Sequence, residues 1–354
     1  MSWVAIGDGK RPLRAPAPAA RNRLLPVGSL VIELHPESDR TGTQTLVHLD
    51  RETGWRHRLT ITLSPGGEVV VEHRQGGSAT FAILTEPRIL PQETLRLTYA
   101  WNAPARCGWL TAENATTGAL VHSRFDDPHP LPMADAAALT SGTGDAARVH
   151  PSVAFLAVSD RVEPVGPMPG YLAGTWVDTA TGPRPIETIA AGDLVTCGSG
   201  GLKPVRHAVS REVPALGQFR PVRLRAPFLG LRTDLCTAPH HRVLVESSDT
   251  EYLFGTESAL IEARHLGPMS GPAQRRAGTT VRYHQLVLDR HDCLLTGGAW
   301  SESLNIGDLA RRPARLAQSV LAGISPRNLP VHADSAGPLL KPYEAMVLVS
   351  SLCA

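Results

Sequence analysis

The sequence predicts an all-β protein with two domains. Its 354 residues are enough for two separate hydrophobic cores. The 32 glycines and 30 prolines, with only 5% aromatic residues, are typical of many turns between short strands. Over residues 59–63, Leu59, Ile61 and Leu63 alternate with threonines, which is the period-two pattern of a strand with one buried face.

Residues 27–126 are expected to form a β-sandwich of the jelly-roll type. The turn sequence Ser64-Pro-Gly-Gly separates the 59–63 strand from Glu68-Val-Val-Val, so these segments predict a hairpin. Further strands are expected at similar spacing, which suits two packed sheets. They begin at Thr45, Ala79, Thr94, Gly108 and Ala119.

Three other segments are expected to lie outside the two domains. The Pro/Ala/Arg stretch that starts at Arg11 cannot build strand ladders, so residues 1–26 are interpreted as a flexible leader. Residues 127–165 are rich in proline and glycine and are interpreted as a linker with one short strand near 151–158. Residues 306–354 are interpreted as a tail, with a short helix over 306–321.

Composition excludes several classes of partner. The 35 basic and 33 acidic residues give a net charge of +2, so nucleic acid or an anionic membrane is not the expected partner. The five cysteines lie far apart and are odd in number, which argues against a disulfide framework or a zinc ribbon. No secretory signal or apolar span is visible. We expect a soluble chain, either cytoplasmic or exported by a route without a signal peptide.

Five sequence blocks between 170 and 305 occur in a recognisable order. They begin with Gly170-Tyr-Leu-Ala-Gly-Thr and Gly182-Pro-Arg-Pro-Ile-Glu, and continue with Ala238-Pro-His-His-Arg and Asp289-Arg-His, before Ser301-Glu-Ser. This order resembles the Hint (hedgehog/intein) domain, in its bacterial type 2 branch. The resemblance implies a β-horseshoe over 166–305. The sandwich before it resembles the concanavalin and laminin-G domains.

The resemblance places the catalytic nucleophile at residue 170. In such domains a cysteine there attacks the preceding peptide carbonyl and converts the amide to a thioester. Here the position holds Gly170, which has no side chain. The domain therefore resembles an autoproteolytic domain that lacks its nucleophile.

In the family, the block that begins here at Ala238 normally supplies a hydroxyl and an imidazole that polarise the scissile bond and protonate the leaving amine. Aligning Pro239 with the family's proline puts Ala238 at the hydroxyl position and His241 at the imidazole position. A shift by one residue gives Thr237 and His240 instead. The first alignment implies that the hydroxyl is also lost.

Residues 281–291 resemble a family pattern in which Asp289 and His291 match, while Gln285 stands at a usual histidine position and His284 comes one residue early. If the strand continues, alternation sends Gln285, Asp289 and His291 to one face. We expect His241, Asp289 and His291 to form a residual site. Hydrogen bonding of Asp289 and His291 to loop backbone is the alternative.

Three functions compete. The leading hypothesis is a degenerate Hint domain without self-splicing or autoproteolysis, since Ser301-Glu-Ser also lacks the asparagine that splicing requires. The second is an active domain that cleaves its own N-terminal flank through an unconventional nucleophile. If the fold still holds Gly170 beside the residual site, Gly170→Cys with Ala238→Thr is expected to give partial thiol-dependent cleavage before residue 170.

The third hypothesis is binding of a glycan or extracellular polymer by the sandwich, with Trp55, Trp101 and Trp109 as a stacking platform. No cofactor is expected. A metal site is not expected either, because the spacing of the histidines matches no zinc signature. The histidines considered for it are His240, His241, His284 and His291.

Overall fold

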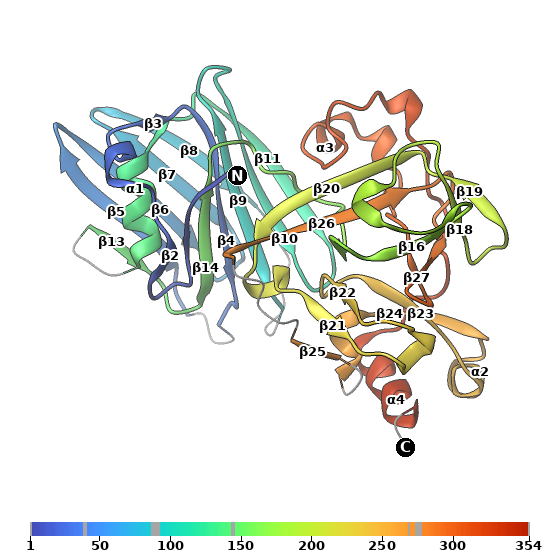
Figure 1. Cartoon of the computed structure of the whole chain (residues 1–354). Coiled ribbons are helices and arrows are strands. Elements are labelled where there is room, and N and C mark those ends of the chain that lie inside the picture. Colours follow the sequence, from blue (N-terminus) through green and yellow to red (C-terminus); the bar gives the residue numbers. More distant parts are fainter. Residues whose placement is uncertain are drawn as a thin grey trace. The chain divides into compact units, whose positions relative to one another are not determined.

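The computed structural model describes residues 2–37, 41–85, 93–142, 146–267, 270–272 and 278–352. The chain divides into two compact units, Met1–Gly166 and Pro167–Ala354. Strands make up most of the regular structure in both units, as Figure 1 shows. The all-β prediction is confirmed.

The first unit is a sandwich of two antiparallel sheets. The seven-stranded sheet has the order β11 (Leu120–Asp126), β10 (Cys107–Asn114), β9 (Leu95–Asn102), β4 (Val27–Leu34), β14 (Val153–Ser159), β1 (Trp3–Gly7) and β2 (Pro12–Arg14). The five-stranded sheet has the order β13 (Ala147–Val149), β5 (Gln44–Thr53), β6 (Trp55–Leu63), β7 (Val69–Gln75) and β8 (Ser78–Leu84). A small pair joins β3 (Leu24–Leu25) to β12 (Leu131–Pro132).

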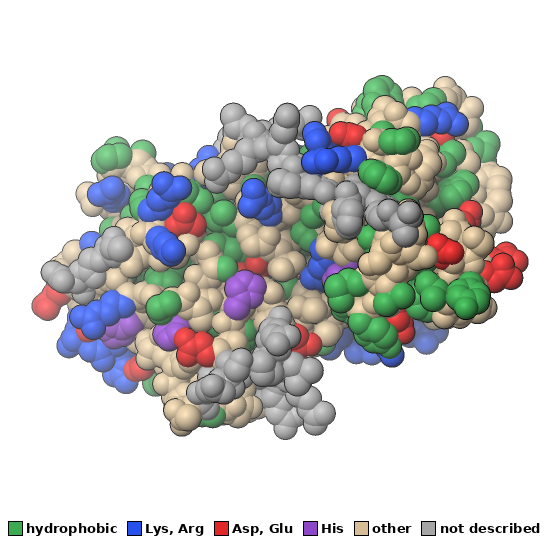
Figure 2. All heavy atoms as spheres, turned by 90° about the horizontal axis from the view of Figure 1, so that it is seen from below, with side chains coloured by type: hydrophobic (Ala, Val, Ile, Leu, Met, Phe, Trp, Pro, Cys, Tyr) green, Lys and Arg blue, Asp and Glu red, His purple; other side chains and the backbone are tan. Residues whose placement is uncertain are grey.

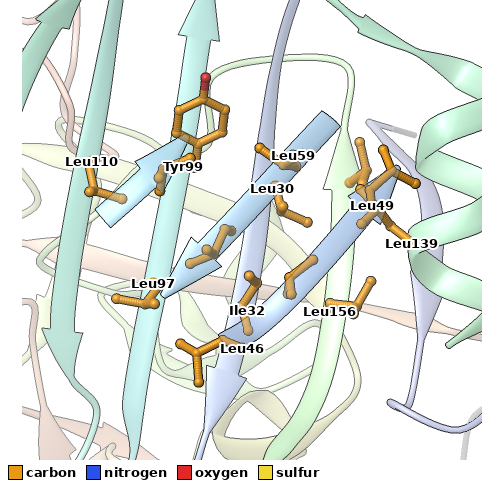
Figure 3. Close-up of a cluster of buried hydrophobic side chains, with 14 of the residues drawn as sticks. Leu30, Ile32, Leu46, Leu49, Leu59, Leu97, Tyr99, Leu110, Leu139 and Leu156 are labelled. Atoms are coloured by element: carbon orange, nitrogen blue, oxygen red, sulfur yellow. The ribbon is translucent and has the colours of Figure 1, made fainter. Parts of the chain in front are cut away.

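The core of this unit lies between its two sheets. Leu30 on β4 and Leu97 on β9 face Leu46 and Leu59 of the other sheet, and all four are buried (Figure 3). The predicted hairpin is confirmed, since β6 and β7 are neighbours and the Ser64 N–H donates to the Glu68 carbonyl oxygen at 2.9 Å. Alternation in the sequence therefore identified the inward faces of these strands correctly.

The interpretation of residues 1–26 as a flexible leader is wrong. Trp3 is 1% exposed, and β1 pairs with β14 inside the seven-stranded sheet. The proline stretch of 11–20 does keep ladders short, but the apolar run from Trp3 to Gly7 is long enough for one strand. Further along, the Leu25 carbonyl oxygen accepts a hydrogen bond from the Trp101 indole at 2.8 Å.

The interpretation of residues 127–165 as a linker is also wrong, although the expected strand near 151–158 is present as β14. Helix α1 (Met133–Ser141) buries Ala136 and Leu139 in the sandwich core. Its Asp135 pairs with Arg51 of β5 at 2.7 Å. The prolines and glycines flank these elements rather than replace them.

The second unit contains two further antiparallel sheets. The first has the order β20 (His207–Pro214), β26 (Thr280–Val287), β15 (Tyr171–Leu172), β22 (Leu235–Thr237), β21 (Val222–Leu224) and β25 (Ser270–Pro272). The second has the order β19 (Leu202–Pro204), β18 (Leu194–Thr196), β16 (Trp176–Thr179), β27 (Cys293–Thr296), β28 (Ala299–Glu302), β23 (Arg242–Glu246) and β24 (Ser258–Glu262), with β17 (Gly182–Pro185) on β16.

Short helices lie between these strands and after the last of them. The α-helices of this unit are α2 (Ser248–Phe254), α3 (Pro313–Leu316) and α4 (Pro342–Leu352). Single 3₁₀ turns in the chain are η1 (Pro18–Ala20), η2 (Ile186–Thr188), η3 (Gly217–Phe219), η4 (Phe228–Gly230), η5 (Ala263–His265), η7 (Leu309–Arg311) and η8 (Pro326–Asn328).

Residues 306–352 are part of the second unit rather than a loose tail. The helix expected over 306–321 is replaced by η7 and the four-residue α3, because Pro313 can begin a helix but cannot continue one. Leu348 and Val349 of α4 pack in the core of the unit. The high proline content led to the prediction of a tail, although the segment contains short helices that bury apolar side chains.

The surface carries no single dominant charge on the face shown in Figure 2, where basic side chains lie in small groups with acidic and neutral ones between them. Within the described residues, no helix is both long and apolar enough to cross a membrane.

Candidate functional site

Gly170 is held by hydrogen bonds on both sides of its Cα. Its N–H donates to Oε1 of Gln285 at 3.2 Å, and its carbonyl oxygen accepts the N–H of Ala238 at 2.7 Å. The next residue, Tyr171, pairs with Thr237 of β22 and with His284 of β26. Two strands that are distant in sequence therefore fix the backbone at the position where the resemblance in the sequence predicts the nucleophile.

The space beside Gly170 is filled by the imidazole of His241. A Cβ built on Gly170 would lie 2.7 Å from Cγ and 2.9 Å from Cβ of His241, and closer still to Nδ1. Carbon atoms that are not bonded normally approach to about 3.5–4.0 Å. No side chain, not even a methyl group, fits at residue 170 unless His241 moves.

His241 is packed tightly in this position. It is 1% exposed, and its ring lies 4.2 Å from the ring of Tyr171, centroid to centroid. Burial lowers the pKa of His241 well below the usual value, and the neighbouring side chains of His240, Arg242 and His291 lower it further. The imidazole is therefore neutral at ordinary pH, and its Nε2 has no hydrogen-bond partner in the described part of the chain.

Glu302, at the end of β28, is the acidic residue of a buried cluster that it forms with His241, Arg242 and His291. Its Oε1 accepts the Arg242 N–H at 3.0 Å, and its Oε2 lies 3.4 Å from the Arg242 guanidinium and 3.4 Å from Nε2 of His291. Nδ1 of His241 is 3.9 Å from Oε1, which is too long for a hydrogen bond. Sequence reasoning missed Glu302, although it belongs to the Ser301-Glu-Ser block.

His291 presents a defined ring nitrogen to Glu302. Its Nδ1 accepts the N–H of Ala336 at 3.0 Å, so the ring N–H lies on Nε2, the atom that faces the carboxylate. Asn305 also lies 3.3 Å from Nδ1. Residues beyond 305 therefore take part in holding this side chain.

Gln285 joins Gly170 to the same cluster. While its Oε1 accepts from Gly170, its Nε2 donates to the carbonyl oxygen of Glu302 at 2.7 Å. Gln285 is 2% exposed. The structure thus brings together Gly170, Ala238, His241, Gln285 and His291.

Asp289 does not join them, which corrects the expectation from alternation. Its carboxylate is 61% exposed and pairs with Arg206 at 3.0 Å. Strand β26 ends at Val287, so the period of two no longer applies two residues later. The chain then turns before His291 returns to the interior.

The remaining residues considered from sequence lie elsewhere. His240 places Nε2 3.3 Å from the Met168 carbonyl oxygen rather than beside Gly170. In the part of the chain that the structure describes, no three His, Cys, Asp or Glu side chains are arranged to hold a metal ion.

The three tryptophans do not form a common platform. Trp101 is 1% exposed in the sandwich core, whereas Trp55 and Trp109 belong to different sheets.

Comparison with known proteins agrees with the blocks in the second unit. Residues 169–308 match the family model described as the Hint domain. No curated protein matches the chain.

Solved structures show similarity to each unit at low identity. A bacterial intein-like domain from Clostridium thermocellum is 19% identical, covers 39% of this chain and 99% of its own, and has a TM-score of 0.28. The gp41-1 intein is 10% identical, with coverages of 37% and 97% and a TM-score of 0.24. The sandwich resembles the CBM40 domain of the Ruminococcus gnavus IT-sialidase bound to α2,3-sialyllactose, at 14% identity, coverages of 45% and 86% and a TM-score of 0.31.

Proposed function

We propose, from the premise that the second unit carries a Hint domain, that this domain is a folded module which does not process its own chain. The observation that carries the proposal is the pair formed by Gly170 and His241. The nucleophile is absent, and the imidazole that would serve it fills the room in which a thiol would stand.

Tyr171 has the hydroxyl nearest to residue 170 in the sequence, and it cannot replace the missing nucleophile. Tyr171 is fully buried, and burial raises the pKa of its phenol well above the usual value. Its hydroxyl lies within hydrogen-bonding distance of the carbonyl oxygens of Ser301, at 3.1 Å, and Glu302, at 3.0 Å. A protonated phenol held on backbone oxygens is a poor nucleophile.

The thiol in the neighbouring strand is also unsuited to attack. Cys293 stands opposite Glu302 in the pairing of β27 with β28. Burial, with the charges of Asp292 and Glu302, raises the pKa of Cys293 to about 12. Since the thiolate is the reactive form, this side chain stays inert near neutral pH.

Intact-mass analysis tests the proposal. The purified full chain is incubated near neutral pH with and without an added thiol, beside His241→Ala as a matched variant. We expect one mass, that of the whole chain, in every sample. Fragments that meet at the Pro169–Gly170 bond, and that disappear in His241→Ala, would instead favour an active domain with an unconventional nucleophile.

A further inference from the structure

Residues 330–340 form a segment between η8 and α4 that we call the strap. The strap contains no helix or strand. Its far end is held to β24 by two backbone hydrogen bonds. The Leu260 N–H donates to the Pro338 carbonyl oxygen at 2.8 Å, and the Leu340 N–H donates to the Leu260 carbonyl oxygen at 3.0 Å. These two bonds involve no side chain, so no titrating group takes part in them.

The middle of the strap is held by two imidazole rings instead. The Ala336 N–H donates to Nδ1 of His291 at 3.0 Å. His332, which belongs to the strap, accepts the Ile306 N–H at its own Nδ1 at 3.2 Å, and its Nε2 donates to the Leu288 carbonyl oxygen at 3.0 Å. The two rings are stacked, with their centroids 6.2 Å apart. A ring nitrogen that accepts a hydrogen bond carries no proton, so both contacts require an unprotonated Nδ1.

His291 lies between the strap and the buried cluster of Glu302. Its side chain is 0% exposed, and its Nε2 is 3.4 Å from Oε2 of Glu302. A second proton on this ring is attracted by the carboxylate, but it occupies Nδ1, toward which the Ala336 N–H points. Two N–H groups then face each other and the hydrogen bond to the strap is lost. The titratable side chains around the ring are Glu302 of β28, His241 before β23, His332 of the strap and, next in sequence, Asp292.

His332 is also buried, at 6% exposure. Burial has the largest effect on the pKa of His332 and lowers it. The Leu288 carbonyl oxygen and Asp289 act in the opposite direction, whereas His291 lowers the pKa further. Asp289 itself pairs with Arg206 at 3.0 Å. The ring therefore takes up a proton more readily once the strap has left the protein surface, because an imidazole in water titrates near pH 6.5.

We propose that the strap is a pH-sensitive cover, closed over His291 while both Nδ1 atoms accept backbone N–H groups and released when acid protonates the two rings. Little burial opposes its release, since residues 333–335 are exposed, including Asp334, the one charged residue of the strap. A further bond, from the His332 N–H to the Gly307 carbonyl oxygen at 3.0 Å, is lost with the middle of the strap. The bonds to β24 hold its far end, so release uncovers His291 without unfolding the domain.

Residue-resolved hydrogen exchange of the full chain at pH 7.5 and 5.5, corrected for the intrinsic exchange rate at each pH, tests the proposal. The amides of Ile306 and Ala336 exchange when the strap is released. Their protection should fall about tenfold between the two pH values for each histidine that takes up a proton on release. The amides of Leu260 and Leu340, which are bonded to backbone carbonyl oxygens, should be better protected at both pH values.

His332→Gln separates titration from packing. A glutamine amide has an oxygen to accept the Ile306 N–H and an N–H to donate to Leu288, but it takes up no proton. The loss of protection at pH 5.5 should therefore be about tenfold smaller in this variant. His284→Gln, at a half-buried histidine of β26 outside the strap, is the matched control and should leave the loss unchanged.

Three results overturn the proposal. The first is protection at Ile306 and Ala336 that does not fall at pH 5.5. The second is equal protection of these amides and those of Leu260 and Leu340, which would mean that the strap does not open separately. The third is a loss as large in His332→Gln as in the original chain. The first two comparisons use the unchanged protein, so they decide the matter even if the variant fails to fold.

Discussion

Two buried regions, one in each unit, differ in the side chains that they contain. Between the sheets of the first unit, Leu30, Leu97 and Leu59 make an aliphatic core of the ordinary kind. Around residue 170 of the second unit the interior is polar, with Gln285 and Glu302 hydrogen-bonded into it and a neutral imidazole packed against a glycine. Strand alternation in the sequence is enough to predict the aliphatic core. The polar region depends instead on one contact, that of Gly170 with the ring of His241.

The largest expected effect belongs to the aliphatic core. Leu97→Ala removes a 2% exposed side chain from between the sheets and should lower the free energy of unfolding by about 2–5 kcal/mol. Leu24→Ala, at a 47% exposed leucine, is the matched control and should change it by no more than about 0.5 kcal/mol. Hydrogen exchange should show lost amide protection in β4 and β9. Equal loss throughout the second unit would contradict the description of two separate cores.

A methyl group at residue 170 tests the fit in the polar interior. Gly170→Ala should destabilise the second unit by about 1–3 kcal/mol, because the new Cβ overlaps His241. Adding His241→Ala removes the ring and should recover part of that loss, because only the Cβ contact at 2.9 Å remains. Gly267→Ala, where nothing lies within 4 Å of the new atom, should be close to neutral. Chemical denaturation of the four chains measures these differences, and a harmless Gly170→Ala would mean that the pocket is not filled.

Acid should destabilise both units through buried histidines. In the first unit, burial, followed by His129 and His57, lowers the pKa of His73 to about 3, and His241 is lowered for the same main reason. Both rings are neutral in the fold, while the unfolded chain takes up protons near pH 6.5. The free energy of unfolding is therefore highest above pH 6.5. As the pH falls below 6.5, it decreases by up to about 1.4 kcal/mol per pH unit for each group. Denaturation at pH 7.5, 6 and 5 measures the slope, and His73→Gln should reduce it. An unchanged slope in that variant would show that His73 is not responsible.

The smallest change in stability is expected at Asp289, which strand alternation had wrongly placed in the site. Asp289→Asn breaks only an exposed pair with Arg206 and should cost no more than about 1 kcal/mol. The contacts of Glu302 with Arg242 and His291 should be unaffected, which a comparison of imidazole NMR signals would show. A shift of the His291 signal would mean that Asp289 belongs to the buried cluster after all.

Sequence patterns predicted those parts of the molecule whose pattern is local. Alternation located β6, β7 and β8, and the block order placed Gly170 and His241 in one region. Trp3 and Leu139 were missed because neighbouring prolines and glycines suggested loops, although each apolar segment was long enough to be buried.

The missed or misplaced site residues depend on tertiary pairing. Glu302 stands in no periodic pattern and reaches the site only because β28 pairs with β23 and β27. Asp289 was misplaced because the sequence does not show that β26 ends at Val287. The filling of the space at Gly170 by His241 is a contact between residues 71 positions apart, and no spacing rule contains it.

The most direct test of the central claim is intact-mass analysis of the Gly170→Cys, Ala238→Thr chain incubated with a thiol. Sequence alone suggested that this variant would regain cleavage, but the position of His241 reverses that expectation, because the new Cβ and the imidazole compete for one space. We predict a single mass, that of the whole chain, together with lower stability than the unchanged protein. Thiol-dependent fragments ending at Pro169, from a variant as stable as the original, would show that the space is open and would contradict the account.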